Sequence, residues 1–407
     1  MKNVLLKWSK LNLIFRIIIG LVIGAVLGIV FPQLNGIGIL GKVFVGALKA
    51  IAPVLVFILV MSSLASAKGK IGSRFRTVVI LYMLSTLLAA VVAVAASYLF
   101  PLTIVLTEAA ENTPPGGIGE VLSNLLTNMV SNPVTAVADA NYVGILFWSI
   151  IFGIGLKLYA GEDTIHVITD LSDVVSKAVG WVIQFAPFGI LGLMFTTVSE
   201  NGLGIFADYG KLLLLLVGSM LVVALAVDPL IAALFLKRNP YPLVFRCLKE
   251  SGLTAFFTRS SAANIPVNMS LCEKLGLERD FYSVAIPLGA TINMDGAAVT
   301  ITVMTLAVAN TLGIQVNPVT ALLLSVLATL GACGTSGVAG GSLLLIPMAC
   351  SLFGIGNDVA MQAVAVGFII GVVQDSVETA LNSSGDVMFA ATAEFYEKIR
   401  RGEEVKI

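Results

Sequence analysis

Eight apolar stretches, each long enough to cross a lipid bilayer, constrain this chain more than any other feature of its sequence. About 20 apolar residues in a helix span the hydrocarbon core, and such stretches occupy residues 12–31, 43–66, 78–101, 141–160, 174–199, 211–236, 281–308 and 357–392. A backbone in lipid must satisfy its own hydrogen bonds, which favours helices. Because 57% of the 407 residues are hydrophobic and 12% are charged, we predict an all-α integral membrane protein with eight transmembrane helices.

Positive charge is distributed unevenly between these stretches. Lys and Arg gather near the N-terminus and in the segments 68–76, 157, 237–249 and 398–401, whereas the connection 103–142 contains neither. Basic residues concentrate on the cytoplasmic side of membrane proteins, so both termini are predicted to be cytoplasmic. The charged start lacks a small-residue cleavage site, and we expect the first stretch to be a spanning helix and not a signal peptide.

Charge and cysteine usage exclude several other classes. The formal net charge is zero and no basic run reaches five residues, so nucleic-acid binding has no electrostatic support. The four cysteines lack the spacing of zinc sites or of a disulfide framework; they are Cys247, Cys272, Cys333 and Cys350.

Two further segments are apolar but interrupted. Residues 321–330 and 343–353 flank a Gly-rich centre, 331–342, and each flank would be about 15 Å long as a helix. That length is half of a ~30 Å hydrocarbon core, which predicts a re-entrant hairpin. Segment 243–277 repeats this plan around a polar centre, 258–264. Paired interrupted segments indicate a transporter site near the membrane midplane; two surface loops are the alternative.

A polar stripe lies within the last apolar stretch. Asp375, Glu378, Thr379, Asn382 and Asp386 are three or four residues apart, so they share one face of a helix. Each carboxylate held in hydrocarbon costs at least ~2.5–3.5 kcal/mol, and such residues are usually functional. We therefore expect cations and polar groups of other segments to balance this stripe; a buried polar seam between helices is the alternative.

A third polar interruption is Asn293-Met294-Asp295-Gly296. Asn, Asp and Gly are poor residues for a helix interior, so we predict local unwinding that releases carbonyl oxygens. Carbonyls and the Asp295 carboxylate are ligands that suit a hard cation such as sodium. A kinked helix with Asp295 bound by neighbouring hydroxyls is the alternative.

Together, four motifs in this order resemble the dicarboxylate/amino acid:cation symporter family, which has the glutamate-transporter fold. They are Thr258-Arg259-Ser260-Ser261, the Asn-Met-Asp-Gly break, Gly334-Thr335-Ser336-Gly337-Val338 and the stripe. The resemblance covers the whole chain and is closest to the serine/threonine:sodium symporters of bacteria. It implies eight spans with two re-entrant hairpins, a homotrimer, and a location in the bacterial inner membrane among its lipids.

The resemblance also implies an elevator mechanism with two domains. Residues 1–77 and 103–210 would form a scaffold, residues 78–102 and 211–393 a transport domain, and residues 394–407 a cytoplasmic tail. The second hairpin would be the outer gate.

The same resemblance implies the site residues. Co-transported sodium would be bound by a first set, Gly289, Asn293, Asn382 and Asp386; a second set, Thr291, Met294, Ala332, Cys333 and Thr335; and a third set, Tyr82, Ser85, Thr86, Asn293 and Asp295. The substrate would contact Ser260, Ser261, Ala297, Val338, Ala339, Ser342, Asp375, Glu378, Thr379 and Asn382. Among these, Asp375 would bind the substrate ammonium, and Asn382 with the first hairpin tip would bind the carboxylate.

One position departs from the family members that carry acidic amino acids. Those members have an arginine where this chain has Glu378, and the like charge disfavours an acidic side chain. Ala297 likewise stands where those members have a hydroxyl residue. We therefore predict import of serine and threonine with sodium, and we hypothesise that Arg259 pairs with Glu378 as a specificity pair; the alternative is that Glu378 pairs elsewhere or is protonated.

Three alternatives are weighed against this prediction. A sodium- or proton-coupled symporter of dicarboxylates or acidic amino acids is the nearest. A channel would need a repeated selectivity-filter motif, which the sequence lacks. An intramembrane hydrolase would need an activated nucleophile, but the one histidine, His166, lies in a predicted cytoplasmic connection and no Gly-x-Ser-x-Gly motif occurs; we do not expect an enzyme.

Overall fold

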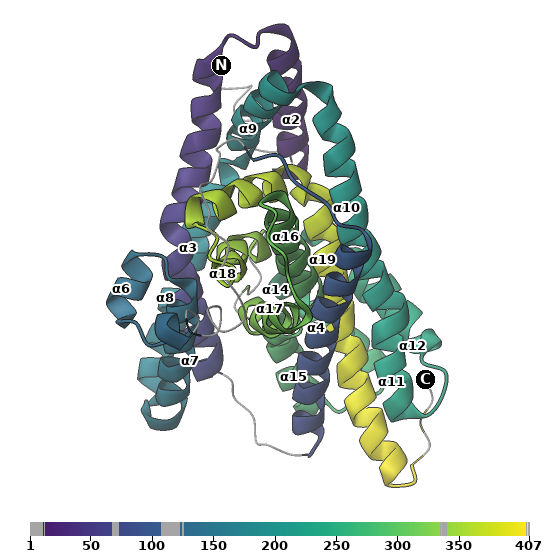
Figure 1. Ribbon diagram of the computed structural model, residues 1–407. Helices are drawn as coiled ribbons and strands as arrows, with labels where there is room; N and C mark the ends of the chain where they lie inside the picture. Colours follow the sequence, from purple (N-terminus) through teal and green to yellow (C-terminus); the bar gives the residue numbers. More distant parts are fainter. Residues whose placement is uncertain are drawn as a thin grey trace.

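The computed structural model describes residues 11, 13–66, 73–106, 123, 126–333, 335, 340–403 and 405, and its regular structure is helical (Figure 1). The first half contains α2 (Leu13–Val30), η1 (Asn35–Ile37), α3 (Gly38–Ser66), α4 (Ser73–Leu99), α6 (Pro133–Ala138), α7 (Tyr142–Tyr159), α8 (Glu162–Gln184) and α9 (Ala186–Asn201). The second half begins with η2 (Gly202–Gly204), α10 (Ile205–Val222), the π-helical turn η3 (Val223–Val227) and α11 (Asp228–Leu236). It continues with α12 (Tyr241–Cys247), the π-helical turn η4 (Leu248–Gly252), α13 (Leu253–Thr258), α14 (Ser261–Lys274), α15 (Arg279–Ile292), α16 (Asp295–Thr311), α17 (Pro318–Ala332), η5 (Ser342–Leu345), α18 (Ile346–Ser351) and α19 (Asn357–Arg400).

Several helices have the length and hydropathy of membrane spans. Six described segments meet both criteria: Gly38–Ser66, Arg74–Leu99, Tyr142–Tyr159, Ala186–Leu236, Arg279–Thr311 and Asn357–Arg400. Phe15–Val30, Pro318–Ala332 and Ser342–Ser351 are apolar but shorter. The chain is therefore an integral membrane protein, whereas the count of eight crossings stays a prediction.

Two helix boundaries differ from the predicted stretches. The stretch 174–199 is divided between α8 and α9 at Phe185, because Pro187 in the first turn of α9 has no N–H to continue the α8 ladder. The last helix runs beyond residue 392 to Arg400, since no proline interrupts it and its final turn carries basic residues that favour a helix C-terminus.

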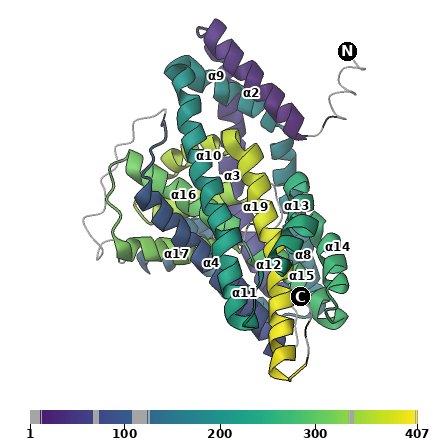
Figure 2. The ribbon, with the colours of Figure 1, turned by 90° about the vertical axis from the view of Figure 1, so that its right-hand side faces the viewer.

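Helices α2, α3, α7, α8 and α9 pack mainly on one another. In Figure 2, α2 and α9 lie side by side at the top of the molecule. Three glycines of α2 face the α9 backbone, and a β-carbon on the middle one, Gly24, would lie 2.4 Å from the carbonyl oxygen of Leu191. Small residues are what allow two membrane helices to approach so closely.

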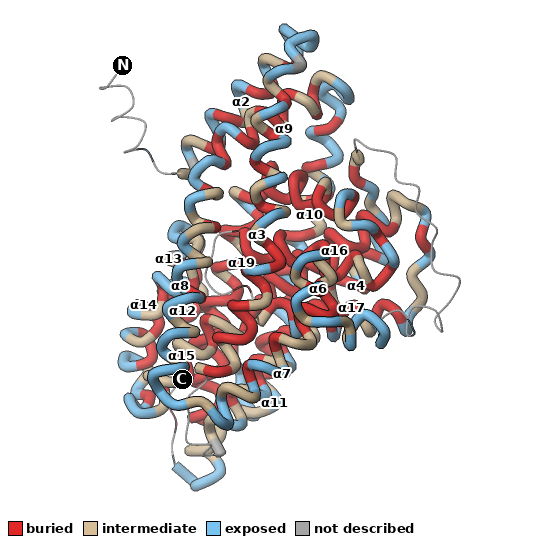
Figure 3. Tube along the Cα trace, turned by 90° about the vertical axis from the view of Figure 1, so that its left-hand side faces the viewer, coloured by how far each residue is buried: buried red, intermediate tan, exposed pale blue. Residues whose placement is uncertain are grey.

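Helices α16 and α19 form the centre of the second group, which also includes α4, α10, α11, α17 and α18. An apolar 18-residue window of Arg279–Thr311 is 94% buried, whereas one of Ala186–Leu236 is 33% buried. Figure 3 shows this as a red centre between paler outer helices. The central helices are therefore surrounded by protein, and the outer ones present apolar surface to lipid.

Both predicted hairpins are present as helical pairs. In the first, α12 and α13 lead to a reversal at Arg259 (φ +51°), and Ser260 caps α14 by accepting a hydrogen bond from the Ala263 N–H. Ser251 donates to Asn268 Oδ1 at 2.5 Å and joins the two arms. In the second, α17 is followed by η5 and α18. Residue 334 and residues 336–339 of its tip, which include the predicted site residues Val338 and Ala339, lie outside the described residues, as does most of the predicted external loop, residues 107–122, 124 and 125.

The predicted unwinding at residues 293–294 is confirmed. Asn293 (φ −91°, ψ 84°) ends α15 and Met294 (φ −124°, ψ 50°) precedes α16. Two side chains from other helices satisfy the amides of the break: Thr86 Oγ1 accepts from the Met294 N–H at 3.2 Å, and Asn382 Oδ1 accepts from the Gly296 N–H at 2.8 Å. The break is thus held between α4 and α19.

Candidate functional site

The polar stripe of α19 is helical and buried, as its spacing predicts. Each of its five side chains belongs to a residue that is at most 6% exposed. The break between α15 and α16 faces this stripe, because a β-carbon on Gly296 would lie 2.8 Å from Glu378 Cα. Glycine at this position therefore lets α16 approach α19 at the level of the carboxylates.

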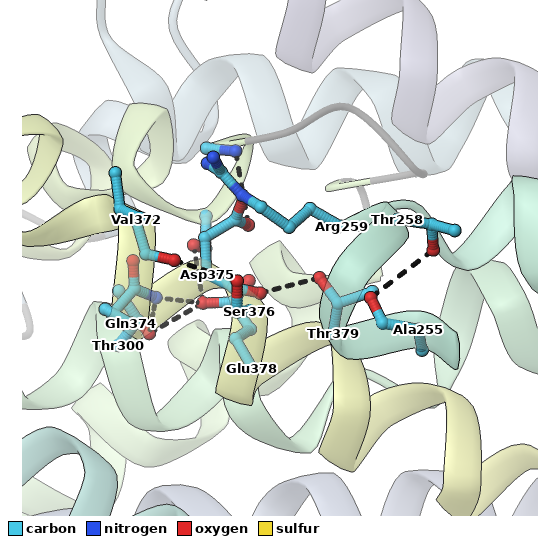
Figure 4. A network of polar contacts seen from close by, with 12 residues as sticks. Ala255, Thr258, Arg259, Thr300, Val372, Gln374, Asp375, Ser376, Glu378 and Thr379 are labelled. Atoms are coloured by element: carbon cyan, nitrogen blue, oxygen red, sulfur yellow. Dashed lines mark hydrogen bonds and ion pairs between the residues drawn. The ribbon is translucent and has the colours of Figure 1, made fainter. Parts of the chain in front are cut away.

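Arg259, at the tip of the first hairpin, forms an ion pair with Asp375. Its Nε and Nη2 both lie 2.6 Å from Asp375 Oδ2, and Figure 4 shows the guanidinium reaching across to that carboxylate. The other Asp375 oxygen accepts from the Gly340 N–H at 3.4 Å. The hypothesised Arg259–Glu378 pair is therefore wrong for this structure.

Glu378 has neutral hydrogen-bond partners instead. Its Oε2 accepts from Thr300 Oγ1 at 2.7 Å, from Ser342 Oγ at 2.9 Å and from Gln374 Nε2 at 2.5 Å, and Figure 4 shows Thr300 and Gln374 on this side of the carboxylate. Three donors on one oxygen offset much of the cost of burying it. Glu378 is therefore stabilised without Arg259. The Arg259 guanidinium pairs instead with Asp375, which is on α19 like Glu378.

A small cavity lies between the two hairpins and α19. Its lining includes six of the predicted substrate residues: Ser261, Ser342, Asp375, Glu378, Thr379 and Asn382. Arg259, Met294 and Thr335 complete it. The cavity volume is ≈ 20 Å³, room for about one water molecule. These predicted site residues are thus close together around a closed cavity. A molecule larger than water could bind there only if one of the lining segments moved.

Two predicted substrate residues lie outside this lining. Ser260 occupies the N-cap of α14, and Ala297 is a fully buried member of the hydrophobic core. Their predicted contacts with substrate stay predictions.

Beneath the cavity, two buried oxygens lack partners among the described residues: Asp386 Oδ2 and Asn293 Oδ1. Asn293 Nδ2 donates to Asp386 Oδ1 at 3.2 Å and to the Asn382 carbonyl at 3.0 Å. Gly289 is also close, since a β-carbon there would lie 2.8 Å from Asp386 Oδ1. The first predicted sodium set therefore comes together in space, with two oxygens free to bind a cation.

Two members of the third predicted set, Ser85 and Thr86, bind Asp295. Thr86 Oγ1 donates to Asp295 Oδ1 at 2.8 Å, and Ser85 Oγ makes a short hydrogen bond to Asp295 Oδ2. The Tyr82 hydroxyl instead donates to the backbone carbonyl of Asp386 at 3.0 Å. The sites at Asp295 and Asp386 are therefore neighbours joined by α4.

The second predicted set lies where α17 ends. Cys333 Sγ lies 3.7 Å from the Ile292 carbonyl oxygen, next to the helix break. Two hydroxyls are used locally: Thr291 Oγ1 donates to the Leu288 carbonyl at 2.7 Å, and Thr335 Oγ1 donates to the Ala332 carbonyl at 2.9 Å. The hairpin end and the break are thus adjacent.

Comparison with known protein families identifies the family of this chain. A model of the sodium:dicarboxylate symporter family matches residues 13–394. The chain belongs to that family. The resemblance carried by the four motifs is therefore confirmed, and the class is that of symporters, not of enzymes.

Two relatives of this symporter cover nearly its full length. The serine/threonine transporter SstT of Bifidobacterium adolescentis is 60% identical over 399 residues, which are 98% of this chain and 93% of the relative. The serine/threonine transporter SstT of Streptococcus agalactiae is 58% identical over 396 residues, 97% of this chain and 98% of the relative.

The donor set of the symporter fits sodium. In the described parts of the chain no group of three or more His, Cys, Asp or Glu side chains is suited to a metal ion, so a bound cation would depend also on hydroxyl, amide and carbonyl oxygens. The unpartnered oxygens of Asp386 and Asn293 are of that kind, and oxygen ligands are what hard cations require.

Sequence reasoning missed three polar residues of this centre. Thr300 and Gln374 bind Glu378, and Asp228 is a buried carboxylate beside Ser85. The sequence did point to Asp228 as a candidate functional residue, because it is a single carboxylate inside the apolar stretch 211–236. The sequence did not point to Thr300, since threonine is a common packing residue in apolar helices.

Proposed function

We propose that this protein imports serine and threonine by symport with sodium ions. Membership of a sodium-coupled family and two full-length relatives named as serine/threonine transporters support this proposal. The structural observation on which the proposal rests is that the acidic residue Glu378 lines the cavity and that its Oε2 accepts hydrogen bonds from neutral donors. A substrate carboxylate beside it would meet like charge at low dielectric, whereas a substrate hydroxyl could donate to it.

Substrate binding would rearrange the ion pair at Asp375. In the closed site the Arg259 guanidinium occupies this carboxylate, which is the predicted partner of the substrate ammonium. The ammonium would share or replace the guanidinium, and the substrate carboxylate would lie toward Ser261, the first residue of α14, where free N–H groups favour an anion. Because the cavity has room for about one water, a hairpin must open to admit serine.

Sodium would bind at the sites around Asp386 and Asp295. Both carboxylates are fully buried, and in the described residues neither forms an ion pair with Lys or Arg. An uncompensated buried charge is costly, so a cation that arrives with the substrate stabilises the loaded site. Transport of the substrate and of sodium would therefore be coupled, because the loaded site is stable only when the substrate and the cation are both bound.

The proposed mechanism is of the elevator type. Residues 1–77 and 103–210 would form the scaffold of a homotrimer, and residues 78–102 and 211–393 would form the moving transport domain with the second hairpin as outer gate. The packing of α2, α3, α7, α8 and α9 on one another, and of α4 and α10 on α16 and α19, supports this division. Both termini and the tail 394–407 would face the cytoplasm across eight crossings of the bacterial inner membrane.

The decisive experiment is uptake of labelled serine into proteoliposomes. We expect accumulation under an inward sodium gradient, little under a proton gradient with choline in place of sodium, and stronger competition by threonine than by alanine, aspartate or succinate. Accumulation that is independent of sodium would overturn the coupling, and stronger competition by aspartate or succinate would favour the dicarboxylate alternative.

A further inference from the structure

Asp228 is a buried carboxylate to which neither the motifs nor the relatives assign a role. It is the first residue of α11, directly after the π-helical turn Val223–Val227, and is 2% exposed. A π-turn inside a helix frequently marks a functional position. The carboxylate lies against α4, where Ser85 Oγ is 3.3 Å from Asp228 Oδ1.

Ser85 stands between two carboxylates but has one hydrogen to donate. Its short contact is with Asp295 Oδ2, and the Thr86 hydroxyl donates to the other Asp295 oxygen at 2.8 Å. If both hydroxyl hydrogens go to Asp295, Asp228 has no donor from this pair. In the described parts of the chain, no lysine or arginine pairs with Asp228 or Asp295.

A second observation points to a bound ion. Asn293 is fully buried, and its Oδ1 has no partner among the described residues. Its amide and the Asp295 carboxylate both approach Gly385, because a β-carbon there would lie 2.7 Å from Asn293 Nδ2 and 3.8 Å from Asp295 Oδ2. Gly385 and Asp228 also line one cavity of ≈ 10 Å³. Gly385 thus borders the Asn293 amide, the Asp295 carboxylate and the cavity that Asp228 lines.

We propose that Asp228 is a ligand of the sodium ion at Asp295, so that this site is built from two carboxylates. This inference rests on the proposed sodium symport and extends it to α11, whose residues the sequence motifs leave out. Ser85, whose hydroxyl oxygen is near both carboxylates, and Asn293 Oδ1 supply neutral oxygens of the kind that hard cations accept. A second negative charge near the ion strengthens its attraction in a low-dielectric interior.

The test compares Asp228→Asn with a matched control, Asp208→Asn, in sodium-dependent uptake of labelled serine into proteoliposomes. Asp208 is an exposed carboxylate of α10 that pairs with Lys211. We expect Asp228→Asn to raise the sodium KM at least about tenfold, with little change in the serine KM at saturating sodium, and Asp208→Asn to match the wild type. An unchanged sodium KM in Asp228→Asn overturns this inference and leaves the proposed function intact. If serine uptake by the wild-type protein does not depend on sodium, the proposed function itself is overturned.

A binding measurement separates an ion effect from poor folding. Sodium chloride, compared with choline chloride, should raise the Tm of detergent-purified wild type and Asp208→Asn by similar amounts, and should raise that of Asp228→Asn clearly less at the same sodium concentration. If Asp228→Asn is not made in folded form, Asp228→Glu keeps the charge and moves it by one methylene. A sodium KM and Tm shift equal to those of the wild type in Asp228→Glu would then count against a direct ligand.

Discussion

At the scale of single residues, the proposed selectivity depends on how Glu378 is held. Its Oε2 is bound by Thr300, Ser342 and Gln374, and the residue lines the cavity. Because these donors are neutral, they fix the orientation of the carboxylate without cancelling its charge. We therefore expect a negative group on the substrate to be repelled, which would disfavour aspartate relative to serine.

Replacing Glu378 with Gln should weaken this discrimination. At a separation of about 6 Å and an effective dielectric constant near 20, two like charges repel by roughly 3 kcal/mol. We expect aspartate to inhibit labelled serine uptake by Glu378→Gln at concentrations at least about tenfold lower than for the wild type, while the serine KM changes much less. Glu273→Gln, an exposed glutamate of the same hairpin that supplies Arg259, should behave like the wild type. Unchanged weak inhibition by aspartate in Glu378→Gln would show that another residue excludes acids.

Spacing predicted the polar stripe of α19 and the family resemblance implied the other site residues, but neither predicted their pairing. Spacing along a helix places Asp375 and Glu378 on one face, and it contains no information about which of them Arg259 reaches. That choice depends on Thr300 and Ser342, which approach Glu378 from α16 and η5. The hypothesised Arg259–Glu378 pair was wrong for this reason, while six of the predicted substrate residues do line the cavity.

At the scale of helices, close contact between α2 and α9 depends on the absence of side chains. Gly20, Gly24 and Gly28 each face a carbonyl oxygen of α9 at a distance that a β-carbon could not tolerate. In a membrane, where burial gives no hydrophobic gain between helices, such close packing is a main source of association. The stability of the first helical group should therefore be sensitive to these positions.

Substituting Gly24 with Val should destabilise the protein, because the new β-carbon would lie 2.4 Å from the Leu191 carbonyl oxygen. Gly46→Val in α3 is the matched control, since a β-carbon there meets nothing within 4 Å. Both variants put a β-branched residue into a helix, so their difference isolates the packing, for which overpacking typically costs about 1–3 kcal/mol. The measurement is Tm in detergent. Equal Tm values for the two variants would mean that α2 and α9 separate at little cost.

Arg74 joins the ends of three helices outside the apolar stretches. Its Nη1 lies 2.6 Å from Glu278 Oε2, before α15, and its Nε lies 2.6 Å from Glu397 Oε2 near the end of α19. The Glu278 N–H donates to the fully buried Glu394 at 3.0 Å. The hydrogen bond from Arg74 lowers the pKa of the Glu278 carboxyl below its ordinary value.

The lowered pKa of Glu278 predicts a pH-dependent contribution to stability. A carboxyl whose pKa is lower in the folded state stabilises it above the unfolded pKa, about 4.3, and this contribution is lost as the pH falls through the folded pKa. Arg74→Gln should therefore lower Tm at about pH 7 and differ less from the wild type at about pH 3. The effect should stay below about 1 kcal/mol because half of the Glu278 side chain is exposed. Arg76→Gln, an exposed arginine of the same helix, is the control; an Arg74→Gln deficit that is equal at both pH values would contradict the pairing.

Helices were more predictable than their boundaries. The break at Asn293-Met294 follows from three residue types that disfavour helix interiors, and it occurs where expected. The division of the stretch 174–199 was missed, because hydropathy is continuous across Phe185 and Pro187 and does not reveal a change of direction. The extension of α19 to Arg400 was also missed, since a helix that leaves the apolar region shows no hydropathy signal.

At the scale of the whole molecule, the question is whether the two helical groups move relative to each other. Among the residues that the structure describes, one ion pair joins them directly: Lys49 of α3 with Asp358, in the first turn of α19. Another pair, Arg74 with Glu397, joins the first turn of α4 to the end of α19. The two residues lie just outside the bounds of the proposed transport domain, but most of each helix belongs to it. Both pairs are side-chain contacts with α19. The first joins α19 to a helix of the proposed scaffold, whereas the second joins α19 to α4, most of which belongs to the proposed transport domain.

Cross-linking these two pairs should therefore have opposite effects. In the variant Lys49→Cys/Asp358→Cys, a short thiol cross-linker would fix α19 to the scaffold in the arrangement seen here, and we expect serine uptake to fall to background and to recover when a reducible linker is cleaved. In Arg74→Cys/Glu397→Cys, the same reagent links helices that are proposed to move together, so uptake should persist. The native cysteines are poorly placed to interfere, because Cys247, Cys272 and Cys350 are buried and Cys333 is partly buried; unmutated protein treated with the linker controls for them. Full uptake after complete cross-linking of the first pair would mean that α3 and α19 do not slide past each other, and an elevator movement across this boundary would have to be abandoned even if sodium symport stands.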